Sequence, residues 1–119
     1  MSGIKYLLDS NIIIGFLNRN PIALDLLITK QIKIEQCAYS AITRIELLSF
    51  SLLTAVEKQA IEKVFSQMMY FALTPTIENE TIEFRRLHKT KLPDSIIAAT
   101  AKYYQLELLT LDKKLADKL

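Results

Sequence analysis

The chain has 119 residues, of which half are hydrophobic, about a quarter are charged, two are glycine and three are proline. This composition excludes a disordered or low-complexity chain and predicts a single globular domain over residues 1–119. The net charge of +2 is too small to indicate nucleic-acid binding by itself. The single cysteine, Cys37, excludes an internal disulfide framework and a CxxC zinc site, and fits a buried core residue in a reducing cytoplasm. The opening apolar stretch is short and interrupted by Lys5 and Asp9, so we expect no signal peptide, no membrane span and a cytoplasmic location.

The first half of the chain predicts strands that alternate with helices. Ile4–Leu8 has the apolar run of a strand that is buried on both faces. Ser10 or Asn11 can cap a helix that follows it through Leu17, and the segment Asn18–Pro21 breaks this helix. Three further elements are expected: a helix over Ile22–Thr29, a strand over Lys33–Cys37, and a helix capped by Ser40 that carries Glu46.

The second half continues the alternation. Thr54 and Glu57 have the spacing of a capping box, and the residues from Val56 to Met68 follow the period of a helix with one apolar face. The remaining expected elements are strands over Met69–Leu73 and Leu106–Thr110, and helices over Thr76–His88, Asp94–Ala101 and Asp112–Leu119. This order predicts an α/β fold with a central parallel sheet between two layers of helices.

Four acidic residues lie at the ends of these elements or beside their apolar faces: Asp9, Glu46, Asp94 and Asp112. Ligands of such folds bind beyond the carboxyl ends of the strands, which is where Asp9 and Asp112 are expected. Each acid also has a structural explanation, because Asp9 can close a turn, Glu46 can pair with a base, and Asp94 and Asp112 can cap helices. Sequence alone does not show whether the four side chains meet.

Clustered carboxylates would repel one another unless a cation neutralised them. A set of oxygen ligands without cysteine or histidine suits Mg²⁺ or Mn²⁺ better than zinc. Such ions activate water and stabilise the displacement reaction at a phosphate. The residues therefore indicate metal-assisted phosphoryl chemistry, without naming a substrate.

Four segments, taken in order, resemble the motifs of PIN-domain ribonucleases: YLLDSNIII, SAITRIELL, LPDSIIAATA and LLTLD. Among these enzymes the chain most resembles the small VapC-type toxins of type II bacterial toxin–antitoxin systems, and the resemblance covers nearly the whole chain. It implies a PIN-like three-layer α/β/α fold and metal-dependent cleavage of RNA phosphodiester bonds.

The resemblance also implies roles for particular residues. Asp9, Glu46 and Asp94 would be catalytic acids that hold Mg²⁺ or Mn²⁺. Asp112 would be the fourth acid, although some relatives have asparagine there and Asp112 can instead cap the last helix. Asn11 and Thr110 would support the acids through hydrogen bonds, with Ser10 and Ser95 as weaker candidates for this role.

Five basic residues are candidates for phosphate contacts with RNA: Arg44, Arg85, Arg86, Lys89 and Lys91. A solvated charged surface is the alternative explanation for them. By resemblance we expect a homodimer and a small antitoxin that fills a groove near the acids. The stretches Ile12–Leu17, Leu47–Leu53 and Val56–Met68 are candidate partner surfaces, or alternatively parts of the core.

Three other classes of protein were weighed against a nuclease. A phosphatase of the haloacid-dehalogenase type also ends its first strand on an aspartate, but its chemistry needs a second acid where this chain has Asn11. A receiver-like phosphoacceptor would need an acidic pair that the chain lacks. A non-catalytic PIN-like interaction module remains the alternative within the same fold.

Overall fold

The protein forms a parallel four-stranded sheet, as the sequence predicted. The computed structural model describes residues 3–119. Strand β1 spans Tyr6–Leu8, β2 Cys37–Ser40, β3 Met69–Phe71 and β4 Glu107–Leu109, in the order β3-β2-β1-β4. All three pairs of neighbouring strands are parallel. Strands β2 and β3 lie on one side of β1, and β4 lies on its other side. The direction in which the chain adds strands to the sheet therefore reverses at β1. In folds of this kind, ligands bind beyond the carboxyl ends of the strands at such a reversal.

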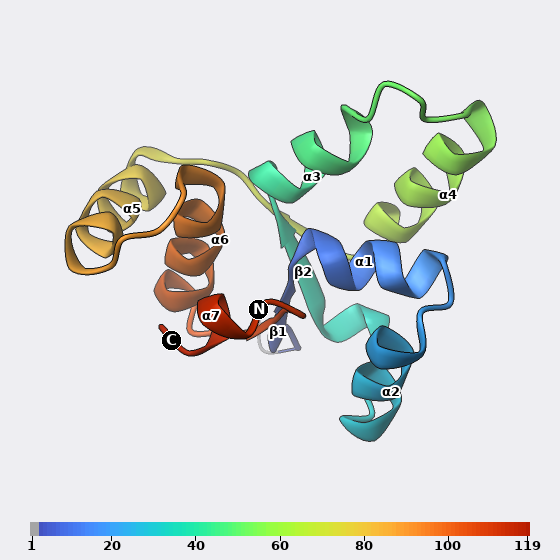
Figure 1. The fold of residues 1–119 in the computed structure, drawn as a ribbon, viewed down its shortest axis with the longest axis horizontal. Coiled ribbons are helices and arrows are strands. Elements are labelled where there is room, and N and C mark those ends of the chain that lie inside the picture. The colour runs from blue at the N-terminus through green and yellow to red at the C-terminus, as the bar shows by residue number, and fades with distance from the viewer. Residues whose placement is uncertain (1–2) are drawn as a thin grey trace.

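Seven α-helices flank the sheet within the described residues. Figure 1 shows α1 to α4 on one side of the sheet and α5 to α7 on the other. Their bounds are α1 Ser10–Leu17, α2 Pro21–Thr29, α3 Ala41–Leu48, α4 Ala55–Ser66, α5 Pro75–Leu87, α6 Leu92–Tyr103 and α7 Lys113–Ala116. The arrangement is the three-layer α/β/α fold that the alternating pattern predicted.

The core lies on both faces of the sheet, because successive strand residues point to opposite faces. On one face Leu8 and Tyr39 pack with buried residues of α1, α3 and α4. On the other face Leu7 and Ala38 pack against Ile97 of α6. Burial on both faces explains why these strands are short apolar runs instead of clean alternations.

The strand predicted over Lys33–Cys37 is placed wrongly. Residues Ile34–Gln36 form a 3₁₀ helix, and the strand begins only at Cys37. The Gln36 side chain accepts a hydrogen bond from the Lys33 backbone N–H (3.1 Å), which closes this turn. Ile32 and Ile34 alternate with polar residues, a pattern typical of a strand with one exposed face. The actual strand β2 lies inside the sheet, and all four of its residues are buried.

Helix caps were predicted with mixed success. Ser40 caps α3 as expected, and Thr54 and Glu57 form the expected capping box of α4 (2.9 and 3.1 Å). The cap of α1 is Asp9 and not Ser10 or Asn11, and α5 begins one residue earlier than expected, behind Thr74.

The predicted apolar face of α4 is narrower than expected. Ile61 and Phe65 are buried, whereas Val56 is 76% exposed. No single helix in residues 3–119 has both the length and the hydropathy to cross a membrane; α1 and α2 pass such a test only when joined, across a bend of 105°.

Gly15 lets α1 approach α2 closely, and its replacement by alanine is expected to destabilise the protein. A Cβ atom at Gly15 would lie 2.6 Å from the Cβ atom of Ala23, which is fully buried. Overpacking costs about 1–3 kcal/mol, and the better helix propensity of alanine offsets about 1 kcal/mol of this. Urea unfolding of Gly15→Ala should therefore show a lower free energy of unfolding than the wild type.

Gly3→Ala is the matched control, because a Cβ atom there meets nothing within 4 Å. Equal or greater stability of Gly15→Ala would contradict the close approach of the two helices.

Candidate active site

Asp9 lies at the carboxyl ends of the neighbouring strands β1 and β4. It directly follows β1, and its backbone N–H donates to the Leu109 carbonyl oxygen of β4 (2.9 Å). Its side chain is only 7% exposed and caps α1 by accepting a hydrogen bond from the Ser10 N–H (2.7 Å). Two elements therefore fix the Asp9 carboxylate: the strand before it and the helix that it caps.

Two polar side chains hold the other oxygen of Asp9. The Thr110 hydroxyl donates to Asp9 Oδ2 (2.7 Å), and Asn11 Nδ2 donates to the same oxygen (3.4 Å) and to Thr110 Oγ1 (3.2 Å). Asn11 also accepts a hydrogen bond from the Leu111 N–H (3.1 Å). The structure thus brings Asn11 and Thr110, expected as supporting residues, into direct contact with Asp9.

Glu46 reaches the same region from α3, but it is not buried. We expected its carboxylate beside the apolar face with a basic residue or a metal as its partner, and the structure shows an exposed side chain instead. Glu46 Oε1 accepts a hydrogen bond from the Ser10 hydroxyl (2.7 Å). Exposure removes the cost of burying this charge, so no basic partner is required.

Asp94 lies in the first turn of α6. It is half-buried, and the next residue, Ser95, is fully buried. The Ser95 hydroxyl donates to the Lys91 carbonyl oxygen (2.8 Å) and shares a hydrogen bond with Thr90 (2.7 Å). These bonds fix the turn that carries Asp94.

The charges of two other acids act on Asp9. Burial raises the pKa of Asp9 above its ordinary value of 3.8, while the hydrogen bonds from Thr110 and Ser10 oppose this rise. The negative charges of Asp94 and Glu46 raise the pKa of Asp9 further. Glu46 is also joined to Asp9 through Ser10, whose N–H donates to Asp9 and whose hydroxyl donates to Glu46.

The Asp112 carboxylate caps a helix and so differs in role from the other three acids. Its Oδ1 atom accepts hydrogen bonds from the N–H groups of Lys114 (3.0 Å) and Leu115 (3.3 Å), so it caps α7. Its own N–H donates to Thr110 Oγ1 (3.0 Å). Asp112 is thus joined to the Asp9 network through its backbone, while its carboxylate serves the helix.

The chemistry of this donor set fits a hard divalent cation. All the donors are oxygens, and within residues 3–119 none of the four acids forms an ion pair with a basic side chain. In the described part of the chain, no three Asp, Glu, His or Cys side chains are close enough to hold an ion in common. The fit to a divalent cation therefore rests on the chemistry of the oxygen ligands.

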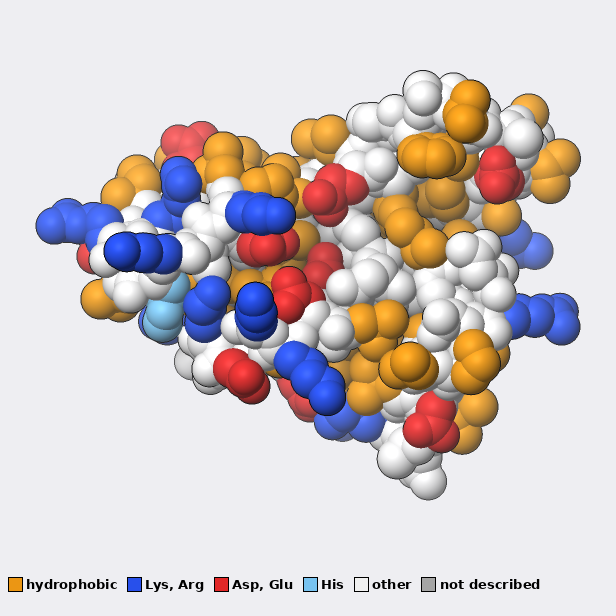
Figure 2. Space-filling view, viewed as in Figure 1, with side chains coloured by type: hydrophobic (Ala, Val, Ile, Leu, Met, Phe, Trp, Pro, Cys, Tyr) orange, Lys and Arg blue, Asp and Glu red, His pale blue; other side chains and the backbone are white. Residues whose placement is uncertain are grey.

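The basic candidates lie in two separate parts of the molecule. Figure 2 shows acidic side chains in the middle of one face, with lysine and arginine side chains beside them over α5 and α6. Arg85, Arg86, Lys89 and Lys91 are all exposed and lie in the last turn of α5 and in the segment that leads to Asp94. Arg44 lies two residues before Glu46 on α3 and lines a separate groove with Tyr39 and Glu62. Residues two apart on a helix point in different directions, so Arg44 does not join the acids.

Ser10 is the contact that sequence reasoning undervalued. The sequence ranked Ser10 below Asn11 and Thr110 as a supporting residue. The sequence signal that could have found this contact is the position of Ser10 next to Asp9, an acid at the end of a strand. A serine in that position can hydrogen-bond two carboxylates, one through its N–H and one through its hydroxyl.

The geometry defines a parallel α/β domain with a buried carboxylate, Asp9, directly after its first strand. A family model of the PIN domain matches residues 6–118, so the chain belongs to the PIN domain family. PIN domains are generally nucleases. No curated protein matches the chain in sequence.

Solved structures agree with this assignment. The chain is similar to a protein in a toxin–antitoxin complex from Klebsiella pneumoniae, with 29% identity, a TM-score of 0.79, and coverage of 92% of this chain and 88% of that one. It is also similar to a chain of FitAcB from Neisseria gonorrhoeae, with 25% identity, a TM-score of 0.73, and coverage of 95% and 91%. A chain of VapBC2 from Rickettsia felis, bound to a fragment of its promoter DNA, shares the fold at 19% identity, with a TM-score of 0.73 and coverage of 96% and 92%.

Asp94→Asn is expected to lower the pKa of Asp9 in the metal-free protein, because it removes one of the charges that oppose ionisation of Asp9. A ¹³C NMR titration of the Asp9 carboxyl group in EDTA measures this change. Asp117→Asn, at an exposed residue that ends α7, should leave the pKa of Asp9 unchanged. A pKa for Asp9 at or below 3.8 in the wild type would contradict this description of the site.

The same pKa shift predicts a dependence of stability on pH. The folded protein holds the Asp9 proton more tightly than the unfolded chain, so this contribution to stability falls as the pH rises from 3.8 through the raised pKa. Urea unfolding over this range in EDTA should show a smaller fall for Asp94→Asn than for the wild type.

Proposed function

We propose that the protein is a metal-dependent endoribonuclease and the toxin of a toxin–antitoxin pair. The observation that carries the proposal is a buried Asp9 at the carboxyl end of β1 in a PIN domain, joined to Glu46 through Ser10 and acted on by the charge of Asp94, with no basic partner among the described residues. An uncompensated group of oxygen ligands has the charge and the chemistry to hold Mg²⁺ or Mn²⁺.

Each acid has a distinct part in the proposed mechanism. Asp9, fixed by its hydrogen bonds, would be the main ligand, and Asp94 and Glu46 would move toward it when a cation neutralises their repulsion. Thr110 and Asn11 would keep the Asp9 oxygens oriented. Asp112 would order the backbone beside Thr110 and act as the fourth acid with the carboxylate oxygen that does not cap α7. A bound divalent ion supplies an activated water and stabilises negative charge on the phosphate.

RNA is the proposed substrate. Figure 2 shows lysine and arginine side chains beside acidic ones on one face. Arg85, Arg86, Lys89 and Lys91 are exposed between the end of α5 and Asp94, so they can neutralise the phosphates that flank the scissile bond. The family membership supports nuclease activity, and the likeness to a protein of a toxin–antitoxin complex supports an antitoxin partner. The proposal adds that residues 1–119 act as one domain on RNA in the cytoplasm, and that the chain forms a homodimer, which light scattering of the purified chain would test.

Purified protein is expected to cleave single-stranded RNA with Mg²⁺ or Mn²⁺, and Asp9→Asn to reduce the rate on the order of 100-fold or more, because it removes the fixed ligand. A time course on labelled RNA, with and without EDTA, measures this. Asp117→Asn is the matched control and should cleave like the wild type.

Cleavage that survives both EDTA and Asp9→Asn would contradict the metal–acid mechanism. Complete absence of cleavage, together with intact folding and partner binding, would favour a non-catalytic interaction module. Release of phosphate from small esters but not from RNA would favour a different phosphate hydrolase.

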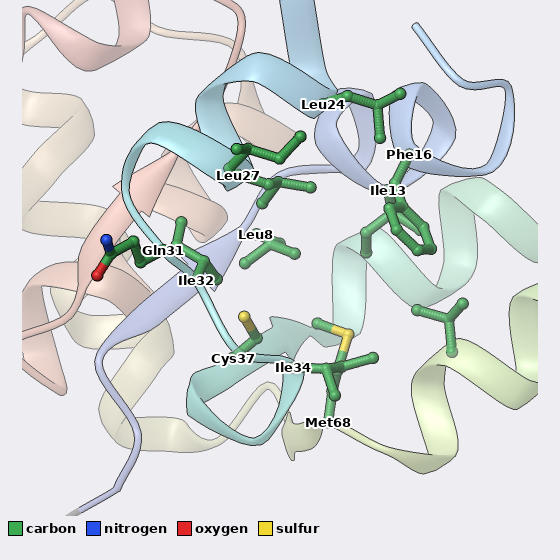
Figure 3. A pocket seen from close by; sticks show the side chains of 12 residues that line it. Leu8, Ile13, Phe16, Leu24, Leu27, Gln31, Ile32, Ile34, Cys37 and Met68 are labelled. Atoms are coloured by element: carbon green, nitrogen blue, oxygen red, sulfur yellow. The ribbon is translucent and has the colours of Figure 1, made fainter. Parts of the chain in front are cut away.

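We propose that the antitoxin binds at an apolar cavity on the α1–α4 side of the sheet. It has a volume of about 320 Å³ and lies between α1, α2 and α4, with the 3₁₀ segment at its base (Figure 3). Its walls include Leu8, Ile13, Leu24, Leu27, Cys37 and Met68.

The lining of this cavity is apolar throughout its named walls. Burial raises the pKa of Cys37 to about 11, so its thiol stays protonated and apolar. The exposed parts of Phe16 and Ile28 extend the apolar surface around this cavity, which suits an apolar segment of a small partner.

Ile28→Asp is expected to weaken binding of the antitoxin about tenfold or more, because it places a charge among apolar contacts. The partner in this test is the product of a small reading frame adjacent to the gene for this chain, and calorimetry of the two purified proteins measures the affinity. Leu87→Asp is the matched control, since Ile28 and Leu87 are each 72% exposed and Leu87 ends α5 on the other side of the sheet. An equal effect of the two substitutions would contradict this location.

A further inference from the structure

We propose that Ser10 is a positioning residue that holds Glu46 beside Asp9, so that a divalent cation meets two carboxylates that are already placed. This inference rests on the proposed function. Ser10 binds both acids at once: its N–H donates to Asp9 Oδ1 (2.7 Å) and its hydroxyl donates to Glu46 Oε1 (2.7 Å).

Glu46 needs such a restraint. Its side chain is exposed on α3, and the Asp9 carboxylate repels it. An exposed glutamate loses conformational entropy when it is fixed, so repulsion and entropy both favour its turning into solvent. Among the described residues, the Ser10 hydroxyl is the one group that hydrogen-bonds the Glu46 side chain.

Ser10 is itself held firmly. It is the first residue of α1, and the helix is anchored by Ile12 and Ile13, which are 0% and 1% exposed. Its position relative to Asp9 is therefore set by the core.

A hydroxyl group is also well suited to this place. It is neutral, so it can join two carboxylates without cancelling the negative charge that attracts a cation. A lysine or arginine here would neutralise the acids and compete with the metal.

The test is Mn²⁺ binding by the full chain, measured by calorimetry for the wild type, Ser10→Ala, Ser10→Thr, Glu46→Ala and the double variant Ser10→Ala/Glu46→Ala. Ser10→Ala should weaken Mn²⁺ binding about three- to tenfold, the effect of one exposed hydrogen bond to a charged group. Ser10→Thr keeps the hydroxyl and should restore affinity. In the Glu46→Ala background, Ser10→Ala should have no further effect.

Ser66→Ala is the matched control, because the exposed Ser66 hydroxyl also donates a hydrogen bond, to the Lys63 carbonyl oxygen on α4. It should bind Mn²⁺ like the wild type. A Ser10→Ala variant with wild-type affinity, or one with the same loss in both Glu46 backgrounds, overturns the positioning role while leaving the proposed function intact.

The same variants in EDTA give a reading that does not depend on metal. Ser10→Ala should lower the urea midpoint of the wild-type protein by more than it lowers the midpoint of Glu46→Ala. An equal decrease in both backgrounds would show that the Ser10 hydroxyl does not hold the Glu46 side chain. A wild-type protein that binds no Mn²⁺ overturns the proposed metal dependence itself.

Discussion

A buried carboxylate at the end of the first strand is the constraint on which the site depends. Asp9 is 7% exposed, and burial raises its pKa, so the folded state must supply hydrogen bonds to keep the charge there. Two elements supply these hydrogen bonds: the Ser10 N–H at the start of α1, and the Thr110 hydroxyl just after β4. The same groups that make the charge tolerable also fix the direction of its oxygens.

This constraint connects the two ends of the chain. Thr110 receives hydrogen bonds from Asn11 and from the N–H of Asp112, and Asn11 accepts one from the N–H of Leu111. The segment that leads into α7 is thereby fastened to the start of α1, about a hundred residues away in sequence. The reversal of strand order between β1 and β4 makes these contacts possible, because it places the two strand ends side by side.

Sequence reasoning predicted the fold, and singled out the acids at element ends, because both depend on local patterns. Apolar runs that end on acids mark strand ends, and the Thr54–Glu57 pair marks a helix start whatever surrounds it. It failed where packing decides: Ile32 and Ile34 alternate like an edge strand, yet they precede a 3₁₀ turn and the strand begins at Cys37. The exposure of Glu46 and its bond to Ser10 depend on the separation of α1 and α3, which no spacing in the sequence records. The apolar cavity between α1, α2 and α4 is likewise a product of how helices meet, so the stretch Ile12–Leu17 alone could not distinguish core from partner surface.

Crystallography with Mn²⁺ tests the central claim, that Asp9, Glu46 and Asp94 form one cation site, most directly. Crystals grown with Mn²⁺ should show an anomalous difference peak within bonding distance of Asp9, with carboxylate oxygens of Asp94 or Glu46 drawn toward it, at about 2.0–2.2 Å. A fully occupied Mn²⁺ site elsewhere, with no peak at Asp9, would contradict it.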